Sequence, residues 1–181
     1  MKFITRRSKN KLRKKRIYDL VGADDRFVMR GTAYFAKKRG LWRRVVHIFV
    51  FNRQGELLIC KRPSWAKSYP NLITSSAGGK VDLGETYLFA ARRELKEELG
   101  ITPLLKEIGG YGVKTKKHGK ILHKLFVAHA NRVYPNKKEI AEVCFVTIKK
   151  LSRDIKHHPK KFILPFLRAF RLYSATHRLP K

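Results

Sequence analysis

Apolar positions along the chain fall into short β-branched or aromatic runs and into helical stripes, which predicts a mixed α+β domain. The run RRVVHIFVF at 43–51 predicts a strand, and ELLICK at 56–61 predicts a second strand returning from it. Asn52–Gly55 between them is typical of a turn, so the two strands are expected to form a hairpin.

The rest of the pattern is consistent with a sheet between helices. Strand-like pieces around a Gly-Ala-Asp-Asp turn are expected within 17–40, and a loop over 63–72. A helical stripe marks 159–172, with apolar residues at Phe162, Ile163, Phe166, Leu167 and Phe170. Further strands are expected at 73–76, 104–113, 121–130 and 142–148.

A second helix is predicted just before residue 100, and it is acidic on one side. Glu94, Glu97 and Glu98 are spaced i, i+3 and i+4, so a helix places their carboxylates together. Their mutual repulsion is relieved by a hard cation, because Mg²⁺ and Mn²⁺ prefer oxygen ligands. An E-x-x-E-E pattern by itself is more often a solvated surface. The same helix is expected to pack on the core through Leu88, Ala91 or Arg92, Leu95 and Leu99.

Glycines surround this helix. Gly78, Gly79 and Gly84 indicate a loop whose backbone lies close to a metal or phosphates, and Gly100 suits a left-handed helix end. Either Asp82 or Glu85 is expected to cap the helix or to favour its positive end.

Residues 79–101, GKVDLGETYLFAARRELKEELGI, resemble the signature of the Nudix hydrolases, G-x5-E-x7-R-E-U-x-E-E-x-G-U with U aliphatic. A chance match in a chain of this length is on the order of 10⁻⁷ from average residue frequencies. The resemblance implies an α/β/α sandwich with a mixed central sheet, and metal-dependent cleavage of a diphosphate linked to another moiety. Every fixed position is filled, by Gly79, Glu85, Arg93, Glu94, Leu95, Glu97, Glu98, Gly100 and Ile101.

The resemblance also implies roles for these residues. Glu94, Glu97 and Glu98 are the expected catalytic and metal-binding residues, and Glu85 is expected to assist directly or through water. Arg93 is expected to orient the carboxylates. Gly78, Gly79 and Lys80 are the expected substrate contacts, with a nucleoside diphosphate-type compound as substrate and Mg²⁺ or Mn²⁺ as cofactor. Two later acids, Glu139 and Glu142, are candidates for a further ligand or general base, and Glu97 or Glu98 is the competing assignment for the base.

Over residues 18–172 the chain is also similar to the isopentenyl-diphosphate isomerase-like branch of the family, through YPNLITSSAGGKVDLGE and the stretch from 19 to 62. True isomerases carry a Cys immediately before the first signature glycine, where this chain has Gly78, and commonly a His where it has Lys80. The proton-transfer residue that an isomerase needs is therefore missing, whereas every residue that the hydrolase hypothesis requires is present.

Charge is the second informative feature. Forty-three Lys and Arg residues against thirteen Asp and Glu residues give a formal net charge of +30. Such a field attracts anionic substrates and also RNA, although basic composition alone is an equal explanation. An RNA 5′-end pyrophosphohydrolase, or a non-catalytic RNA- or ribosome-binding module, is therefore the alternative function. Residues 1–16 are expected to form a flexible basic arm and 17–181 a single Nudix hydrolase domain.

The remaining signals are weaker. Cys60 and Cys144 are expected to be small core residues of a reducing compartment. No apolar run approaches the ~20 residues of a membrane span, and no secretory signal is recognised, so a cytoplasmic location is expected. His47 is expected to be a hydrogen-bonded core residue more often than a pocket residue. Trp42, Trp65 and Tyr69 are equally suited to the core and to stacking on a ligand.

Overall fold

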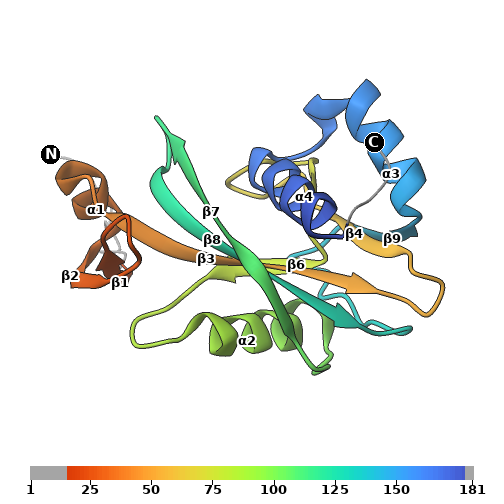
Figure 1. The fold of residues 1–181 in the computed structure, drawn as a ribbon, viewed down its shortest axis with the longest axis horizontal. Coiled ribbons are helices and arrows are strands. Elements are labelled where there is room, and N and C mark those ends of the chain that lie inside the picture. The colour runs from red at the N-terminus through yellow and green to blue at the C-terminus, as the bar shows by residue number, and fades with distance from the viewer. Residues whose placement is uncertain (1–15, 178–181) are drawn as a thin grey trace, which may run out of the picture.

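The apolar run predicted as the first long strand forms β3 (Trp42–Phe51), which lies at the centre of a nine-stranded mixed sheet (Figure 1). The structure is a computed structural model and describes residues 16–177. Strand β3 pairs antiparallel with β6 (Ala77–Lys80) and parallel with β8 (Gly119–His129). The glycine-containing strand β6 therefore lies next to the central strand.

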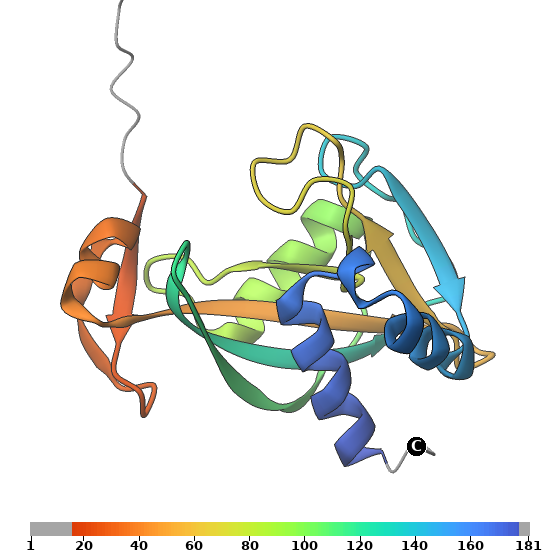
Figure 2. The same cartoon turned by 90° about the horizontal axis from the view of Figure 1, so that it is seen from above.

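The other strands extend the sheet at both ends of β3. The β1–β2 hairpin attaches at the start of β3, and β4 follows β3 through the expected turn. Figure 2 shows β3 running between these two ends. β4 pairs with β5 and β9, and β7 pairs with β8. The bounds are β1 (Ile17–Val21), β2 (Phe27–Thr32), β4 (Leu57–Lys61), β5 (Ile73–Thr74), β7 (Lys106–Thr115) and β9 (Glu142–Val146).

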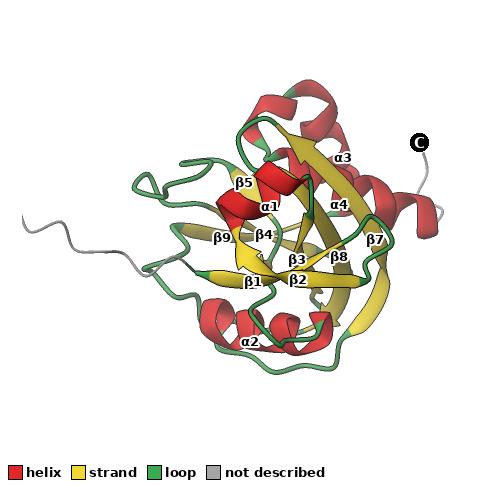
Figure 3. Ribbon diagram, turned by 90° about the vertical axis from the view of Figure 1, so that its left-hand side faces the viewer, coloured by secondary structure: helices red, strands yellow, loops and turns green. Residues whose placement is uncertain are grey.

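Helices cover both faces of the sheet, which confirms the α/β/α sandwich (Figure 3). Side chains alternate along β3, so Val46 and Ile48 pack with α2 while Phe49 packs with α4 on the opposite face. The helices are α1 (Ala33–Arg39), α2 (Tyr87–Leu99), α3 (Ile148–His157) and α4 (Leu164–Thr176), with the 3₁₀ turn η1 (Pro159–Lys161) before α4.

Two helices, α1 and α3, lie in segments where the sequence analysis predicted no helix. In the region 17–40, where only strand-like pieces were expected, Thr32 accepts a hydrogen bond from the Phe35 amide and α1 follows. The strand expected to reach residue 148 ends at Val146, because Thr147 caps α3 in the same way. In both places a threonine cap supplies the acceptor that starts a helix.

The start of α2 also differs from expectation. Its N-cap is Thr86, whose hydroxyl accepts from the Phe89 amide at 3.2 Å, so neither Asp82 nor Glu85 caps the helix. Leu88 is exposed and does not belong to the packing stripe; Ala90, Ala91, Leu95 and Leu99 are the buried apolar residues. Gly100 ends the helix with φ 64°, as expected for a left-handed position.

Cys60 is buried as expected, but Cys144 is exposed on the outer face of β9 and is not a core residue. The prediction of a basic arm at 1–16 lies outside the described residues except for Arg16, which pairs with Asp82. Within the described part of the chain, no helix is long and apolar enough to cross a membrane.

Candidate metal and substrate site

The site begins where strand β6 passes over helix α2. Gly78, Gly79 and Lys80, expected in a loop, belong to β6 and pair with β3. A Cβ atom on Gly79 would lie 2.0 Å from Glu94 Oε1, so a bare backbone is needed for the carboxylate to occupy this place.

Two carboxylates of α2 lie beneath this strand, Glu94 buried and Glu98 partly buried. Glu94 is 8 % exposed, and burial raises its pKa. One turn later, Glu98 Oε2 accepts a hydrogen bond from the Gly78 amide at 3.1 Å. Burial, and secondly the charge of Glu94, raise the pKa of Glu98 to about 8. Adjacent buried carboxylates of this kind are stabilised when a cation binds them.

Arg93 connects the other acids of the site. Its guanidinium donates two hydrogen bonds to Glu85, from Nε at 2.7 Å and from Nη2 at 2.9 Å. Nη1 donates to Glu94 at 2.8 Å and to Glu97 at 3.3 Å, and Nη2 also donates to the Lys80 carbonyl oxygen at 2.9 Å. The hydrogen bonds from Arg93 lower the pKa of Glu85. Arg93 thus fixes the carboxylates relative to the end of β6.

The donor set suits a hard divalent cation, because every candidate ligand is a carboxylate oxygen. Glu94 is held by Arg93 and Glu98 by the Gly78 amide, whereas the Glu97 side chain is 52 % exposed and has only the longer contact with Arg93 at 3.3 Å. The Glu85 carboxylate accepts hydrogen bonds from Arg93 and from the Asp82 amide. Among residues 16–177, no three His, Cys, Asp or Glu side chains already stand in an arrangement that holds a metal ion.

The two acids that follow the signature, Glu139 and Glu142, differ in their position relative to the cavity. Glu139 lies on the same cavity as Glu98, and its charge is among the smaller causes, after burial, that raise the pKa of Glu98. Glu142 is exposed and pairs with Lys61 Nζ at 2.7 Å. The fold therefore brings Glu139, and not Glu142, to the carboxylates.

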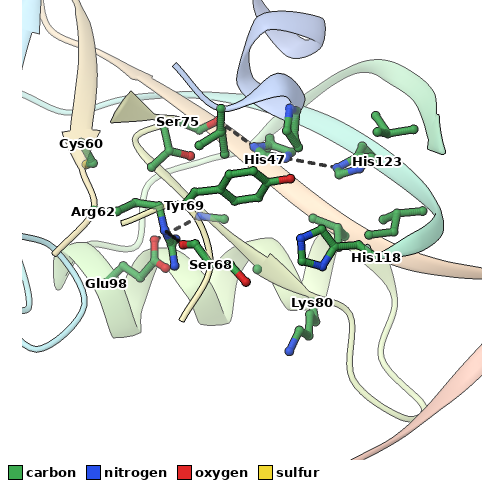
Figure 4. Close-up of a pocket in the computed structure, with 18 of the residues that line it drawn as sticks. His47, Cys60, Arg62, Ser68, Tyr69, Ser75, Lys80, Glu98, His118 and His123 are labelled. Carbon is green, nitrogen blue, oxygen red and sulfur yellow. Dashed lines mark hydrogen bonds between the residues drawn. The ribbon is translucent and has the colours of Figure 1, made fainter. Parts of the chain in front are cut away.

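A cavity of about 230 Å³ opens beside Glu98, on the sheet face opposite α2 (Figure 4). Tyr69 lies on its wall, from a loop in which Tyr69 itself has a left-handed backbone (φ 54°). Such a conformation costs a non-glycine residue about 1 kcal/mol and is concentrated at binding sites. Trp42 does not line the cavity but is buried, and Trp65 is 68 % exposed. The Lys and Arg residues on the cavity are Lys61, Arg62 and Lys80.

Three polar residues of the cavity follow from the strand register and not from any local pattern. His47 is both a hydrogen-bonded core residue and a cavity residue, and it contacts Ser75 and His123. Sequence reasoning did not select Ser75 or His123. The parallel register of β3 with β8, in which Val45 lies opposite His123, brings His123 to His47, and Ser75 reaches His47 from the connection between β5 and β6.

The isomerase position is closed to a side chain. A Cβ atom on Gly78 would lie 2.6 Å from the Val46 carbonyl oxygen, so a cysteine there requires the backbone to move. Cys60 lines the cavity, which its sequence position did not indicate. Its thiol donates to the Ser76 carbonyl oxygen at 3.0 Å, and burial raises the pKa of Cys60, so the thiol stays protonated.

Comparison with curated proteins finds relatives over most of the chain. Isopentenyl-diphosphate Δ-isomerase of Serratia proteamaculans is 28% identical over 153 residues, which are 82% of this chain and 86% of that one. YfcD of Salmonella typhi, described as an uncharacterised Nudix hydrolase, is 26% identical over 135 residues, covering 74% and 73% of the two chains.

Solved structures show the same fold. DR0079 from Deinococcus radiodurans has a TM-score of 0.66 and 25% identity, covering 78% of this chain and 90% of that one. A MutT protein from Methanosarcina mazei Go1 has a TM-score of 0.63 and 20% identity, covering 76% and 94%. The NUDIX domain family itself matches residues 41–166. This match spans more than half of the sequence, so the chain belongs to the Nudix family.

Proposed function

We propose that the protein is a metal-dependent Nudix pyrophosphohydrolase that cleaves a diphosphate linkage in a nucleoside diphosphate-type substrate. The observation that carries this proposal is the pair formed by the buried Glu94 and the partly buried Glu98, whose pKa values are both raised, beside a cavity. Two neighbouring carboxylates with raised pKa values are unfavourable for stability alone, and such pairs concentrate at functional sites.

The carboxylates, Arg93 and Lys80 have different roles in this proposal. Glu94, Glu97 and Glu98 would bind Mg²⁺ or Mn²⁺, which polarises phosphoryl oxygens and lowers the pKa of a bound water. Arg93 keeps Glu94 oriented and holds Glu85 close to the ligands. Lys80 lines the cavity and supplies a positive charge for a substrate phosphate.

The proton of the attacking water needs an acceptor near the ligands. Glu139 suits this role because it lies on the cavity and makes no hydrogen bond or ion pair with Arg93. Glu97 and Glu98 are the alternatives, and both are expected to be occupied as ligands. A Glu139→Gln variant that keeps metal affinity but loses turnover at neutral pH supports the assignment to Glu139.

The direct test measures phosphate or nucleotide release from a panel of diphosphates with Mg²⁺, with Mn²⁺ and with chelator. The panel contains nucleoside di- and triphosphates, dinucleotide polyphosphates, nucleotide sugars, isopentenyl diphosphate and 5′-triphosphorylated RNA. We expect metal-dependent turnover that Glu98→Gln lowers on the order of 100-fold, as when one electrostatic stabiliser is removed from an active site.

The matched control is Glu107→Gln, which removes an exposed carboxylate that pairs with Lys124 on the sheet. This control is expected to keep full turnover. Equal activity of Glu98→Gln and Glu107→Gln would contradict the assignment of the site. Conversion of isopentenyl to dimethylallyl diphosphate would instead support the isomerase reading, which the crowding at Gly78 disfavours.

A second candidate, hydrolysis at the 5′ end of RNA, is favoured by a basic hollow beside the cavity. This hollow of about 400 Å³ shares Thr115 and Gly119 with the cavity wall. Four lysines line it, namely Lys37, Lys114, Lys116 and Lys120. A strand whose 5′ phosphates reach Glu98 would continue over these positive charges.

A further inference from the structure

The basic hollow lies where the C-terminal end of α1 meets the turn between β7 and β8. A Cβ atom on Gly119 would lie 3.6 Å from Lys37 Cβ, so the helix touches the turn. A Cβ atom on Gly40 would lie 3.5 Å from Lys120 Nζ, so this ammonium group reaches the end of the helix. Figures 1 and 2 show α1 and the turn at the same end of β3, remote from α3. Lysines from elements far apart in the sequence therefore converge on one surface.

Two of these lysines lie directly opposite each other in the sheet. Lys114 and Lys120 are cross-strand partners in β7 and β8, and like charges in such a pair destabilise a sheet. Their ammonium groups both lie over the Trp42 ring, 5.5 and 5.8 Å from its centroid. The ring attracts each ammonium group but leaves the net charge unchanged. An anion that contacts both lysines relieves their repulsion.

The protein supplies no such anion in the part of the chain that the structure describes. The lysines of residues 16–177 that pair with a carboxylate are Lys61 and Lys124, and neither lies on the hollow. The negative end of the α1 dipole carries about half an elementary charge, against four ammonium groups. The lysines that line the hollow therefore keep an excess positive charge: Lys37, Lys114, Lys116 and Lys120.

An exposed aromatic ring lies on the same helix as part of this charge. Tyr34 is 72 % exposed on α1, and Lys37 and Lys38 follow it at i+3 and i+4. Residues at these spacings share one face of a helix. An aromatic side chain beside a basic groove is the arrangement on which the bases of single-stranded nucleic acid stack while their phosphates follow the positive charges.

We propose that α1 and the β7–β8 turn form a binding surface for single-stranded nucleic acid, in which Tyr34 stacks on a base and the lysines of the hollow bind neighbouring phosphates. The surface lies outside the carboxylate site and requires neither a 5′ phosphate nor hydrolysis, so it goes beyond the proposed function. A duplex is disfavoured because its bases are stacked on each other. An acidic polypeptide neutralises the lysines but offers no base to the Tyr34 ring.

The test uses an RNA dodecamer with a 5′-hydroxyl end and a 3′ fluorophore, in chelator, so that neither the metal site nor a 5′ phosphate contributes. Fluorescence anisotropy with the full chain measures its affinity. Unlabelled RNA and DNA of the same sequence, inorganic polyphosphate and polyglutamate compete at equal charge concentration.

We expect the nucleic acids to displace the probe at least tenfold better than polyphosphate or polyglutamate do. The stronger competitor of RNA and DNA identifies the source of the ligand, and equal competition by the two supports a surface that contacts base and phosphate but not the sugar. Failure of the probe to bind, or equal displacement by polyphosphate or polyglutamate, would overturn the proposal.

Variants of Tyr34 test the stacking contact. Tyr34→Leu removes the ring but keeps a good helix former, and it is expected to weaken RNA binding about tenfold, which corresponds to about 1.4 kcal/mol. Tyr34→Phe keeps the ring and should keep the affinity. The matched control is Tyr134→Leu, because Tyr134 is 66 % exposed and does not line the hollow. Equal affinities of Tyr34→Leu and Tyr134→Leu would contradict stacking on Tyr34.

A double variant, Lys114→Gln with Lys120→Gln, tests the phosphate contacts. Two contacts at about 0.7 each predict roughly 25-fold weaker binding at about 0.1 M salt. Lys149→Gln with Lys150→Gln removes the same charge from α3 and should have a much smaller effect. Equal losses in the two double variants would overturn the assignment of the surface.

Thermal unfolding of each variant identifies any loss of the fold. All variants keep residues 1–15, so the basic residues there contribute equally to every measurement. The outcome is separable from the hydrolase proposal. Nucleic-acid binding that depends on Tyr34, without turnover of any diphosphate, would leave this surface standing and remove the hydrolase.

Discussion

At the scale of single residues, the environment of Glu98 governs the site. Its carboxylate receives one backbone hydrogen bond from Gly78 and lies beside Glu94, away from water. Arg93 contacts Glu94, Glu85 and Glu97, but it makes no hydrogen bond to Glu98. Of the acids on α2, Glu98 is thus the one whose charge is least compensated by the protein itself.

This arrangement predicts how stability depends on pH. The folded pKa of Glu98 is about 8, above the unfolded value of 4.5, so its contribution to stability is fully present below pH 4.5 and is lost as the pH rises through about 8. The difference in free energy of unfolding between the parent chain and Glu98→Gln should change by a few kcal/mol across this window, to the disadvantage of the parent at high pH.

Urea unfolding in chelator between pH 5 and pH 9 measures this difference. Adding Mg²⁺ at pH 8 is expected to stabilise the parent chain more than Glu98→Gln, because the cation binds the ionised carboxylate. Identical pH profiles for the two proteins would show that Glu98 is not held in the uncharged form.

At the scale of elements, the site depends on the contact between β6 and α2. The helix positions Glu94 and Glu98 one turn apart. The glycines of β6 lack side chains, so the Glu94 carboxylate lies close to Gly79 and Glu98 accepts a hydrogen bond from the Gly78 amide. The pairing of β6 with β3 fixes the height of this strand above the helix. Gly79 is therefore required by the position of Glu94, whereas Gly78 is required by the close approach of the β3 backbone.

Gly79→Ala tests this contact. The atoms nearest to the added methyl group belong to the Glu94 carboxylate, 2.0 Å away, so the methyl group would displace this side chain and not the backbone. We expect turnover to fall by roughly 100-fold or more while the melting temperature shifts by only a few degrees, because a small displacement of a catalytic group suffices for such a loss. Kinetics and thermal unfolding of the same preparation measure the two effects. A variant that unfolds outright, or that keeps full turnover, would contradict this account.

At the scale of the whole molecule, a small negative site is enclosed in a strongly positive surface. The chain has a formal net charge of +30, yet five of its thirteen acids lie between residues 82 and 98. A field of this kind draws anions toward the molecule.

If RNA follows the basic hollow, its affinity should depend steeply on salt. Replacing Lys37, Lys114, Lys116 and Lys120 together with Gln is expected to reduce the slope of log K against log salt concentration by roughly 3, at about 0.7 per phosphate contact. The control with equal charge loss replaces four exposed lysines elsewhere: Lys149, Lys150, Lys160 and Lys161. Equal slopes for the two variants, measured by filter binding, would show that the charge acts only as a general field.

The sequence alone determined the chemistry of α2 and most of the strands, because both are carried by local periodicity. The spacing of Glu94 and Glu98 requires a shared helix face, and the alternation of β3 requires a sheet with two apolar faces. The helices α1 and α3 were not predicted because their capping residues, Thr32 and Thr147, were assigned to strand-like segments, and α1 has only seven residues.

Tertiary structure decided which distant residues meet. It placed Glu139 and not Glu142 beside Glu98, and it joined Ser75, His47 and His123 into one row. Strand register and the path of a loop set these contacts, and both depend on long-range packing that no local pattern encodes. Local spacing therefore predicted the carboxylates of α2, whereas long-range packing decided which other side chains line the cavity beside them.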